Sequence, residues 1–137
     1  MIIDKYNEFS DAQAVTASAA STNVVDLLAA GDAENRLMRA QVQVDTAATA
    51  SGSATVAFVL QTSVDEAFTS PITLASSAAI GKATLVAGYQ VFGKGGIRLP
   101  SGCKRYVRMY YTVASGPLTA GAFSAFLTND ADSNLPD

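Results

Sequence analysis

Residues 103 to 113 alternate with a period of two, and this alternation constrains the fold more than any other feature of the sequence. Successive side chains of a strand point to opposite faces, so one face can be buried while the other meets solvent or a partner. We therefore predict a long central strand here, with Cys103 as a buried free thiol. The inward set is Cys103, Arg105, Val107, Met109, Tyr111 and Val113, and the outward set is Lys104, Tyr106, Arg108, Tyr110 and Thr112.

Three further stretches alternate in the same way. Residues 37–46 and 54–61 flank a small-residue turn around Gly52, and we expect these two runs to pair as neighbouring antiparallel strands. The third stretch is 118–128. The side chains expected to face inward are Met38, Ala40, Val42 and Val44, then Ala54, Val56, Phe58 and Leu60, then Phe123, Ala125 and Leu127; those expected to face outward include Arg39, Gln41, Gln43 and Asp45.

Shorter apolar runs between Gly, Pro and Ser turns complete the pattern. We predict strands in 13–20, 24–28 (with a short helix over 23–30 as the alternative), 72–74, 85–86 and 89–92, whereas 97–99 is expected to lead into a turn at Pro100–Gly102. The sequence thus indicates an all-β, jelly-roll-like antiparallel β-sandwich of about eight strands. Its expected limits are 13–128, between an N-terminal arm (1–12) and a polar C-terminal tail (129–137).

Charge is scarce and unevenly distributed along the 137 residues, which suit a single domain. Charged residues make up 15% of the chain, where about a quarter is usual. Residues 1–66 hold nine acids and three bases, residues 67–129 hold six bases and no acid, and the last eight residues add three acids. Two explanations stay open: the two halves pair inside one sandwich, or a basic patch meets an acidic partner. The low charge fits a surface covered by other subunits, or an ordinary sandwich with small neutral side chains.

Several functional classes are disfavoured by what the chain lacks. It has no histidine and one cysteine, which removes the usual general base, the Ser/His and Cys/His nucleophiles and the common zinc ligands. We therefore expect no enzyme activity, cofactor or metal. Gly93–Gly96 leads into a strand and is read as a β-turn rather than a phosphate loop. Asp130–Asn134 lacks the later ligands of a calcium loop and is read as a solvated tail.

Nucleic-acid and membrane partners are also disfavoured. Basic and aromatic side chains around 104–111 could bind single strands, but the sequence pI of about 4.7 argues against it. No signal peptide and no apolar stretch of membrane-spanning length are present, so neither secretion nor a membrane anchor is expected. The lone cysteine is consistent with synthesis in a reducing compartment.

Arg and Tyr side chains are enriched where protein surfaces meet, and they mark the expected interface. The candidate contact residues are Arg98, Lys104, Tyr106, Arg108 and Tyr110, with Tyr6 and Phe9 as anchors in the arm.

Four segments resemble one family of small phage structural proteins: Met1–Lys5, Ser21–Leu27, Leu60–Phe68 and Leu99–Tyr111. Together they look like the capsid cement (decoration) proteins of podoviruses of the Bordetella-phage type. The resemblance implies a jelly-roll domain on the outer face of an HK97-like capsid. It implies the major capsid protein as partner, self-association as a homodimer with a trimer as the alternative, synthesis in the host cytoplasm and a place on the virion exterior. The alternative function is a phage tail or receptor-binding module that recognises a host glycan.

Overall fold

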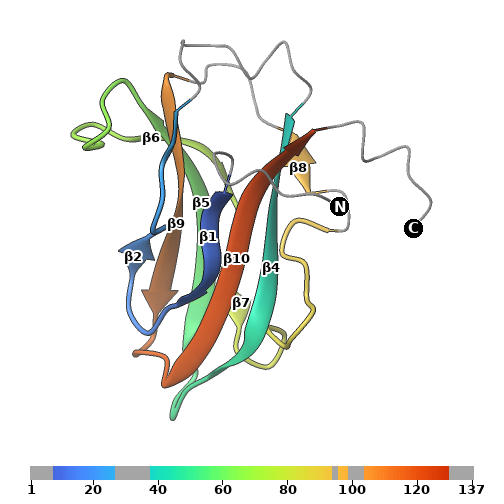
Figure 1. The fold of residues 1–137 in the computed structure, drawn as a ribbon. Coiled ribbons are helices and arrows are strands. Elements are labelled where there is room, and N and C mark those ends of the chain that lie inside the picture. The colour runs from blue at the N-terminus through green and yellow to red at the C-terminus, as the bar shows by residue number, and fades with distance from the viewer. Residues whose placement is uncertain (1–7, 27–37, 94–95, 99–103, 130–137) are drawn as a thin grey trace.

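Antiparallel strands make up the regular structure of the protein, for which the computed structural model describes residues 8–26, 38–93, 96–98 and 104–129 (Figure 1). The predicted all-β antiparallel sandwich is confirmed. Within the described ranges, no helix is long and apolar enough to cross a membrane. The strands are β1 (Glu8–Ala14), β2 (Ala19–Ala20), β3 (Val25–Asp26), β4 (Met38–Thr49), β5 (Thr55–Ser63), β6 (Ile72–Ser76), β7 (Ile80–Gly81), β8 (Ile97–Arg98), β9 (Tyr106–Ala114) and β10 (Ala120–Asn129).

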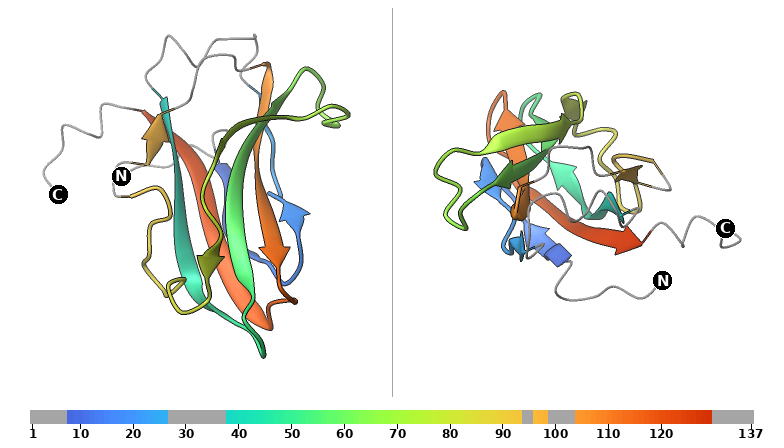
Figure 2. Two further views of the ribbon diagram at one scale, coloured as in Figure 1. Left: turned by 180° about the vertical axis from the view of Figure 1, so that it is seen from behind. Right: turned by 90° about the horizontal axis from the view of Figure 1, so that it is seen from above.

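Two sheets pack face to face (Figure 2). Sheet A has the order β1-β10-β4-β8. Sheet B has the order β2-β9-β5-β6, with β3 also paired to β9 and β7 to β5. The long strands β4 and β10 are neighbours in sheet A, and β5 and β9 are neighbours in sheet B. The core lies between these two pairs.

The four long strands form one antiparallel ribbon that folds over an edge of the sandwich. The β4–β5 and β9–β10 connections both cross from one sheet to the other at the same end of the molecule (Figure 1). At this crossing the Thr119 amide donates to the Thr49 carbonyl at 2.7 Å, and their hydroxyls lie 2.8 Å apart. A rolled ribbon of this kind gives the sandwich its jelly-roll-like character. Its pairing runs from Met38↔Asn129 to Thr49↔Ala120 in sheet A, and from Thr55↔Ala114 to Ser63↔Tyr106 in sheet B.

The predicted pairing of 37–46 with 54–61 is therefore wrong. These runs form β4 and β5, which lie in opposite sheets, and each pairs with a strand from the C-terminal part of the chain. The physical reason is that each strand has one apolar face. In facing sheets, Val42 and Val44 of β4 are buried in the same core as Val56 and Phe58 of β5.

The predicted inward faces of the long strands line this core. Three aromatic rings occupy its centre: Phe58 contacts Tyr111 and Phe123 edge-on, with centroids 5.7 and 5.1 Å apart, and Tyr111 lies 5.6 Å from Phe123. The Tyr111 hydroxyl donates to Ser10 Oγ at 2.7 Å, and burial raises the pKa of this phenol. Buried inward residues are Ala40, Val42, Val44, Ala54, Val56, Leu60, Val107, Met109, Phe123, Ala125 and Leu127. The side chain of Met38 and the whole of Cys103 are outside the part of the chain that the structure describes.

The N-terminal boundary of the sandwich differs from the prediction. Residues 8–12, assigned to an arm, belong to β1 and pair with β10, whereas the strand expected within 13–20 is reduced to the end of β1 and the short β2. Irregular register near Ser10 and Gln13, with Ala12 at a φ of 49°, interrupts the period-two pattern. Phe9 and Ser10 are consequently both buried, and bulges of this kind hide a strand from a search for strict alternation.

The predicted strands at 85–86 and 89–92 are also wrong, because this segment forms turns that contain a single bridge, Gln43↔Gln90. Its backbone nevertheless covers the edge of β4. The amide of Ala48 donates to Leu85, Val44 exchanges bonds with Gly88 and Tyr89, and Val91 donates to Val42. An open strand edge invites pairing with other chains, and this segment closes it. Gln41, expected to face outward, is instead buried at 5% exposure.

The shorter predictions have mixed outcomes. Val25–Asp26 is a strand, as preferred over the helix, although residues 27–30 lie outside the described part of the chain. The run at 72–74 extends to Ser76 as β6, whereas Ile97–Arg98, expected only to lead into a turn, forms the short β8. Asn129 ends β10, and the acidic tail from Asp130 onward is not among the described residues.

Replacing Tyr111 by Phe tests how the core is held. The substitution removes one buried hydrogen bond but keeps the ring, so we expect a loss of about 1 kcal/mol in unfolding free energy. Phe123→Ala, which removes a core ring, should cost about 3–5 kcal/mol. Urea unfolding at pH 7 measures both. Equal losses would contradict this difference, because the hydroxyl bond to Ser10 would then contribute as much as the Phe123 ring.

Candidate interaction surface

The outward face of sheet B carries the main candidate surface, which includes Tyr106, Arg108 and Tyr110 of β9. As predicted, these three side chains alternate with the buried Val107 and Met109 and are themselves half-buried. On β5, the residues paired with them are Ser63, Gln61 and Val59 respectively. The surface is thus a two-strand platform, and its basic and aromatic groups all come from β9.

The other predicted contact residues have different locations. Lys104 immediately precedes this row, and its amide donates to Thr62 Oγ1 at 2.8 Å. Arg98 lies in β8 of sheet A, so it does not join the row; nothing is described of its side chain. Phe9 has no exposed surface, so its assignment as a contact residue is wrong: its strand places it in the core. Tyr6 lies outside the described residues.

Arg108 is held from three sides. Its Nε donates to Gln61 Oε1 at 2.8 Å, and its guanidinium lies 4.3 Å from the ring centre of Phe68 and 5.5 Å from that of Tyr110. Partial burial lowers the pKa of Arg108 and Tyr110 opposes the shift, but an arginine side chain stays charged at neutral pH. Arg108 is therefore engaged by its own molecule through its Nε and through the contacts of its guanidinium with two rings.

The segment Val64–Pro71, here called the β5–β6 loop, supplies Phe68 and is organised by Asp65. The Asp65 carboxylate accepts hydrogen bonds from the hydroxyls of Ser63 and Thr69, both at 2.7 Å, and longer bonds from the Thr69 amide. These bonds, that of the Thr69 hydroxyl first, hold the pKa of Asp65 below its ordinary value. The Phe68 amide donates to the Asp65 carbonyl at 3.1 Å and closes a tight turn.

Phe68 adopts a conformation that a large side chain rarely takes. Its φ is 54°, in the left-handed region, where backbone strain is worth about 1–3 kcal/mol. Its side chain is nevertheless only 5% exposed, packed over the Arg108 guanidinium. Burial of the ring and the bonds of Asp65 offset the strain, so the loop is braced from both ends.

Arg105 joins the acidic and basic halves of the sequence. Its Nε and Nη2 donate to the two carboxylate oxygens of Asp26, at 2.8 and 3.0 Å, and its guanidinium lies 5.1 Å from the ring centre of Tyr106. The bond to Asp26 raises the pKa of Arg105. Arg105 was expected to face inward, but it precedes β9 and is exposed. For this pair, internal pairing of the two halves is the observed arrangement.

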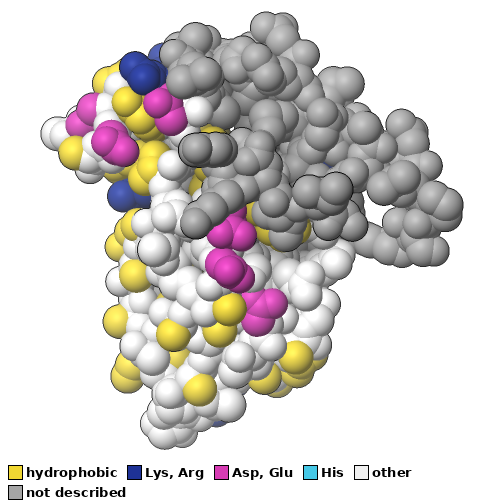
Figure 3. Space-filling view, viewed as in Figure 1, with side chains coloured by type: hydrophobic (Ala, Val, Ile, Leu, Met, Phe, Trp, Pro, Cys, Tyr) yellow, Lys and Arg dark blue, Asp and Glu magenta, His cyan; other side chains and the backbone are white. Residues whose placement is uncertain are grey.

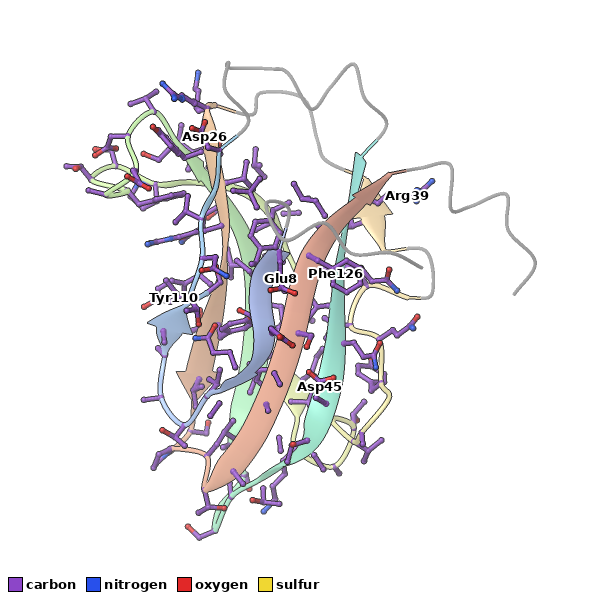
Figure 4. The ribbon with its side chains drawn as sticks, viewed as in Figure 1. Glu8, Asp26, Arg39, Asp45, Tyr110 and Phe126 are labelled. Carbon is purple, nitrogen blue, oxygen red and sulfur yellow. The ribbon has the colours of Figure 1, made fainter. Side chains whose placement is uncertain are left out.

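The outward face of sheet A has acidic side chains instead. Glu8 of β1 and Asp45 of β4 lie on either side of β10 (Figure 4), and acidic groups line this face in the space-filling view (Figure 3). Ser124 of β10 links both neighbours, since its hydroxyl donates to Asp45 and accepts from the Ala12 amide. Acidic groups thus gather on the outward face of sheet A, whereas the sheet B side carries both signs: Asp26, Asp65 and Glu66 as well as Lys104, Arg105 and Arg108.

Sequence reasoning missed three participants: Gln61, Asp65 and Phe68. Gln61 is one of the outward-facing residues of β5. Its position beside Arg108 could therefore be predicted once β9 is known to be the neighbouring strand. Asp65 with Thr69 carries a weak signal, because Asp and Thr side chains often cap turns of this kind. Nothing in the sequence indicates that Phe68 folds back over Arg108, because that contact depends on the tertiary arrangement.

A rolled antiparallel β-sandwich with a braced loop beside an Arg/Tyr surface is the class of structure that these observations define. The chain belongs to the Bbp16 family, whose model matches residues 9–127. This is a family of Bordetella-phage proteins. Comparison with curated proteins gives no match.

Arg108→Ala should destabilise the fold measurably. It removes one hydrogen bond and the cation over Phe68, each worth about 1 kcal/mol, so we expect a loss of about 1–3 kcal/mol in chemical unfolding. Arg105→Ala is the matched control, because its exposed ion pair is screened by solvent and should contribute little to stability. Similar small losses in both variants would contradict the bracing role of Arg108.

The β5–β6 loop should loosen in acid. Because hydrogen bonds lower the folded-state pKa of Asp65 below its ordinary value, its contribution to stability is fully present above that ordinary value and is lost as pH falls through the folded-state pKa. We expect the Thr69 amide resonance to shift in this range in an NMR titration. In Asp65→Asn, the loop-specific transition should vanish. A transition that persists in this variant would assign the effect to another acid.

Proposed function

We propose that the protein is a non-enzymatic structural component of a phage virion that binds the outer surface of an HK97-like capsid and cements neighbouring capsomers. Membership of the Bbp16 family carries this proposal, because it covers residues 9–127 and assigns the chain to phage proteins. The resemblance of four sequence segments to capsid cement proteins supports the finer role. The partner in this proposal is the major capsid protein.

The fold is suited to such a role. A cement protein needs a rigid body that presents the same surface many times, and here a continuous ribbon spans both sheets while a braced loop lies beside the Arg/Tyr surface. A ligand that binds only the assembled shell stabilises it by mass action, by about 2.7 kcal/mol per site at a concentration 100-fold above Kd. Many sites per shell multiply that effect.

Self-association belongs to the same proposal, as a dimer with a trimer as the alternative. Two linked copies that contact neighbouring capsomers would gain from the high effective concentration of the second contact. Tyr106 and Tyr110 are the residues that we assign to contact between copies, because they are half-buried side chains on the outward face of sheet B. Arg108 is less available for this contact, since Phe68 and Gln61 already engage it.

Binding to empty shells tests the function directly. Purified protein is incubated with expanded, undecorated shells, which are then imaged by electron cryomicroscopy and melted by calorimetry beside shells alone. We expect density on the shell exterior between capsomers and a melting temperature that rises with protein concentration. An unoccupied shell with unchanged melting would contradict the proposal. Specific binding on a glycan array would then favour the receptor-binding alternative.

A further inference from the structure

The β5–β6 loop carries an apolar pair at its base. Val64 is 71% exposed and Ile72, the first residue of β6, is 48% exposed. Ile72 pairs with Thr62, only two residues before Val64, so both lie where the loop leaves the sheet. The loop projects beyond the sandwich (Figures 1 and 2), and hydrophobic and charged side chains lie side by side in this region of the surface (Figure 3). Singly exposed apolar residues are common, whereas a clustered pair can indicate a contact site.

We propose that the β5–β6 loop is the element that docks onto the capsid shell, with Val64 and Ile72 seated in an apolar recess of the shell protein and Glu66 facing a basic side chain there. This inference rests on the proposed function and names the site through which it acts. Arg108 and Phe68 are positioning residues in this scheme.

The bracing of the loop is the first argument. Three devices fix its shape: the bonds to the Asp65 carboxylate, the turn closed by the Phe68 amide and the packing of Phe68 on Arg108. A loop that serves only to join two strands needs no large residue in the left-handed region. Strained residues that the surrounding structure over-determines cluster at binding sites, and a loop that is already rigid loses less entropy when it binds.

Charge identifies the kind of partner. Asp65 directs its carboxylate to Ser63 and Thr69, whereas Glu66, its neighbour, is exposed. A partner that covers the loop therefore meets apolar surface beside the exposed Glu66 carboxylate, whose charge also contributes to raising the pKa of Arg105. A Lys or Arg at the rim of the recess would complement this carboxylate.

Matched serine variants test the loop against the rest of the surface. Val64→Ser with Ile72→Ser removes the apolar pair, and Val86→Ser is the control, because Val86 is 50% exposed but lies in the turn segment beside β4. Occupancy on undecorated shells is titrated for each protein, and the melting of the free protein is recorded. We expect the double variant to bind about tenfold more weakly or worse, and Val86→Ser to bind like the wild type. Equal binding by all three, or equal weakening by Val86→Ser, overturns the inference.

Three further substitutions, at Glu66 and Arg108, keep the test valid if the double variant is less stable. Glu66→Lys leaves the apolar pair in place, and we expect severalfold weaker occupancy and a smaller dependence on salt; unchanged occupancy counts against the proposal.

Arg108→Lys keeps a cation over Phe68 and should retain more occupancy than Arg108→Gln, whereas equal occupancy would remove Arg108 as a positioning residue. Wild-type protein that fails to occupy shells overturns both this inference and the proposed function, while wild-type binding without loop dependence overturns the inference alone.

Discussion

The continuous ribbon of β4 with β10 and β5 with β9 is the constraint on which the rest of the structure depends. Its strands each have one apolar face, and folding the ribbon over an edge brings those faces together around Phe58, Tyr111 and Phe123. The hydrogen bonds of the ribbon and the burial of its core therefore form together. The remaining short strands pair along its outer margins, where β1, β2, β3, β6, β7 and β8 lie.

The same ribbon places the candidate surface. Its end in sheet B is the pair Ser63↔Tyr106, so the segment that follows β5 and the segment that precedes β9 must leave the sheet together. The first is the β5–β6 loop, and the second contains Lys104 and Arg105. Residues about 40 positions apart thereby become neighbours, and the contact of Phe68 with Arg108 follows from the position of this end.

The long strands could be predicted because their packing repeats every second residue, and Val107, Met109 and Tyr111 are buried as that period requires. Their partners could not be predicted, since alternation specifies which face is buried and leaves open which strand lies alongside. The period also fails where the backbone is irregular, as in β1 near Ser10 and Gln13. For the surface, the outward Arg and Tyr were found by the same periodicity, but the loop over Arg108 was not, because the contact of Phe68 with Arg108 depends on the tertiary arrangement.

Those contacts change the role of Arg108. An outward arginine between two tyrosines has the composition of a contact site, but this guanidinium already packs on Phe68 and bonds to Gln61, so a partner would have to displace those groups to reach it fully. A partner that binds through the loop leaves the contacts of Arg108 intact, so no free energy is lost in breaking them. Stability and binding are then coupled, because the interactions that offset the strain at Phe68 also hold the exposed Val64, Glu66 and Ile72 in the geometry available to a partner.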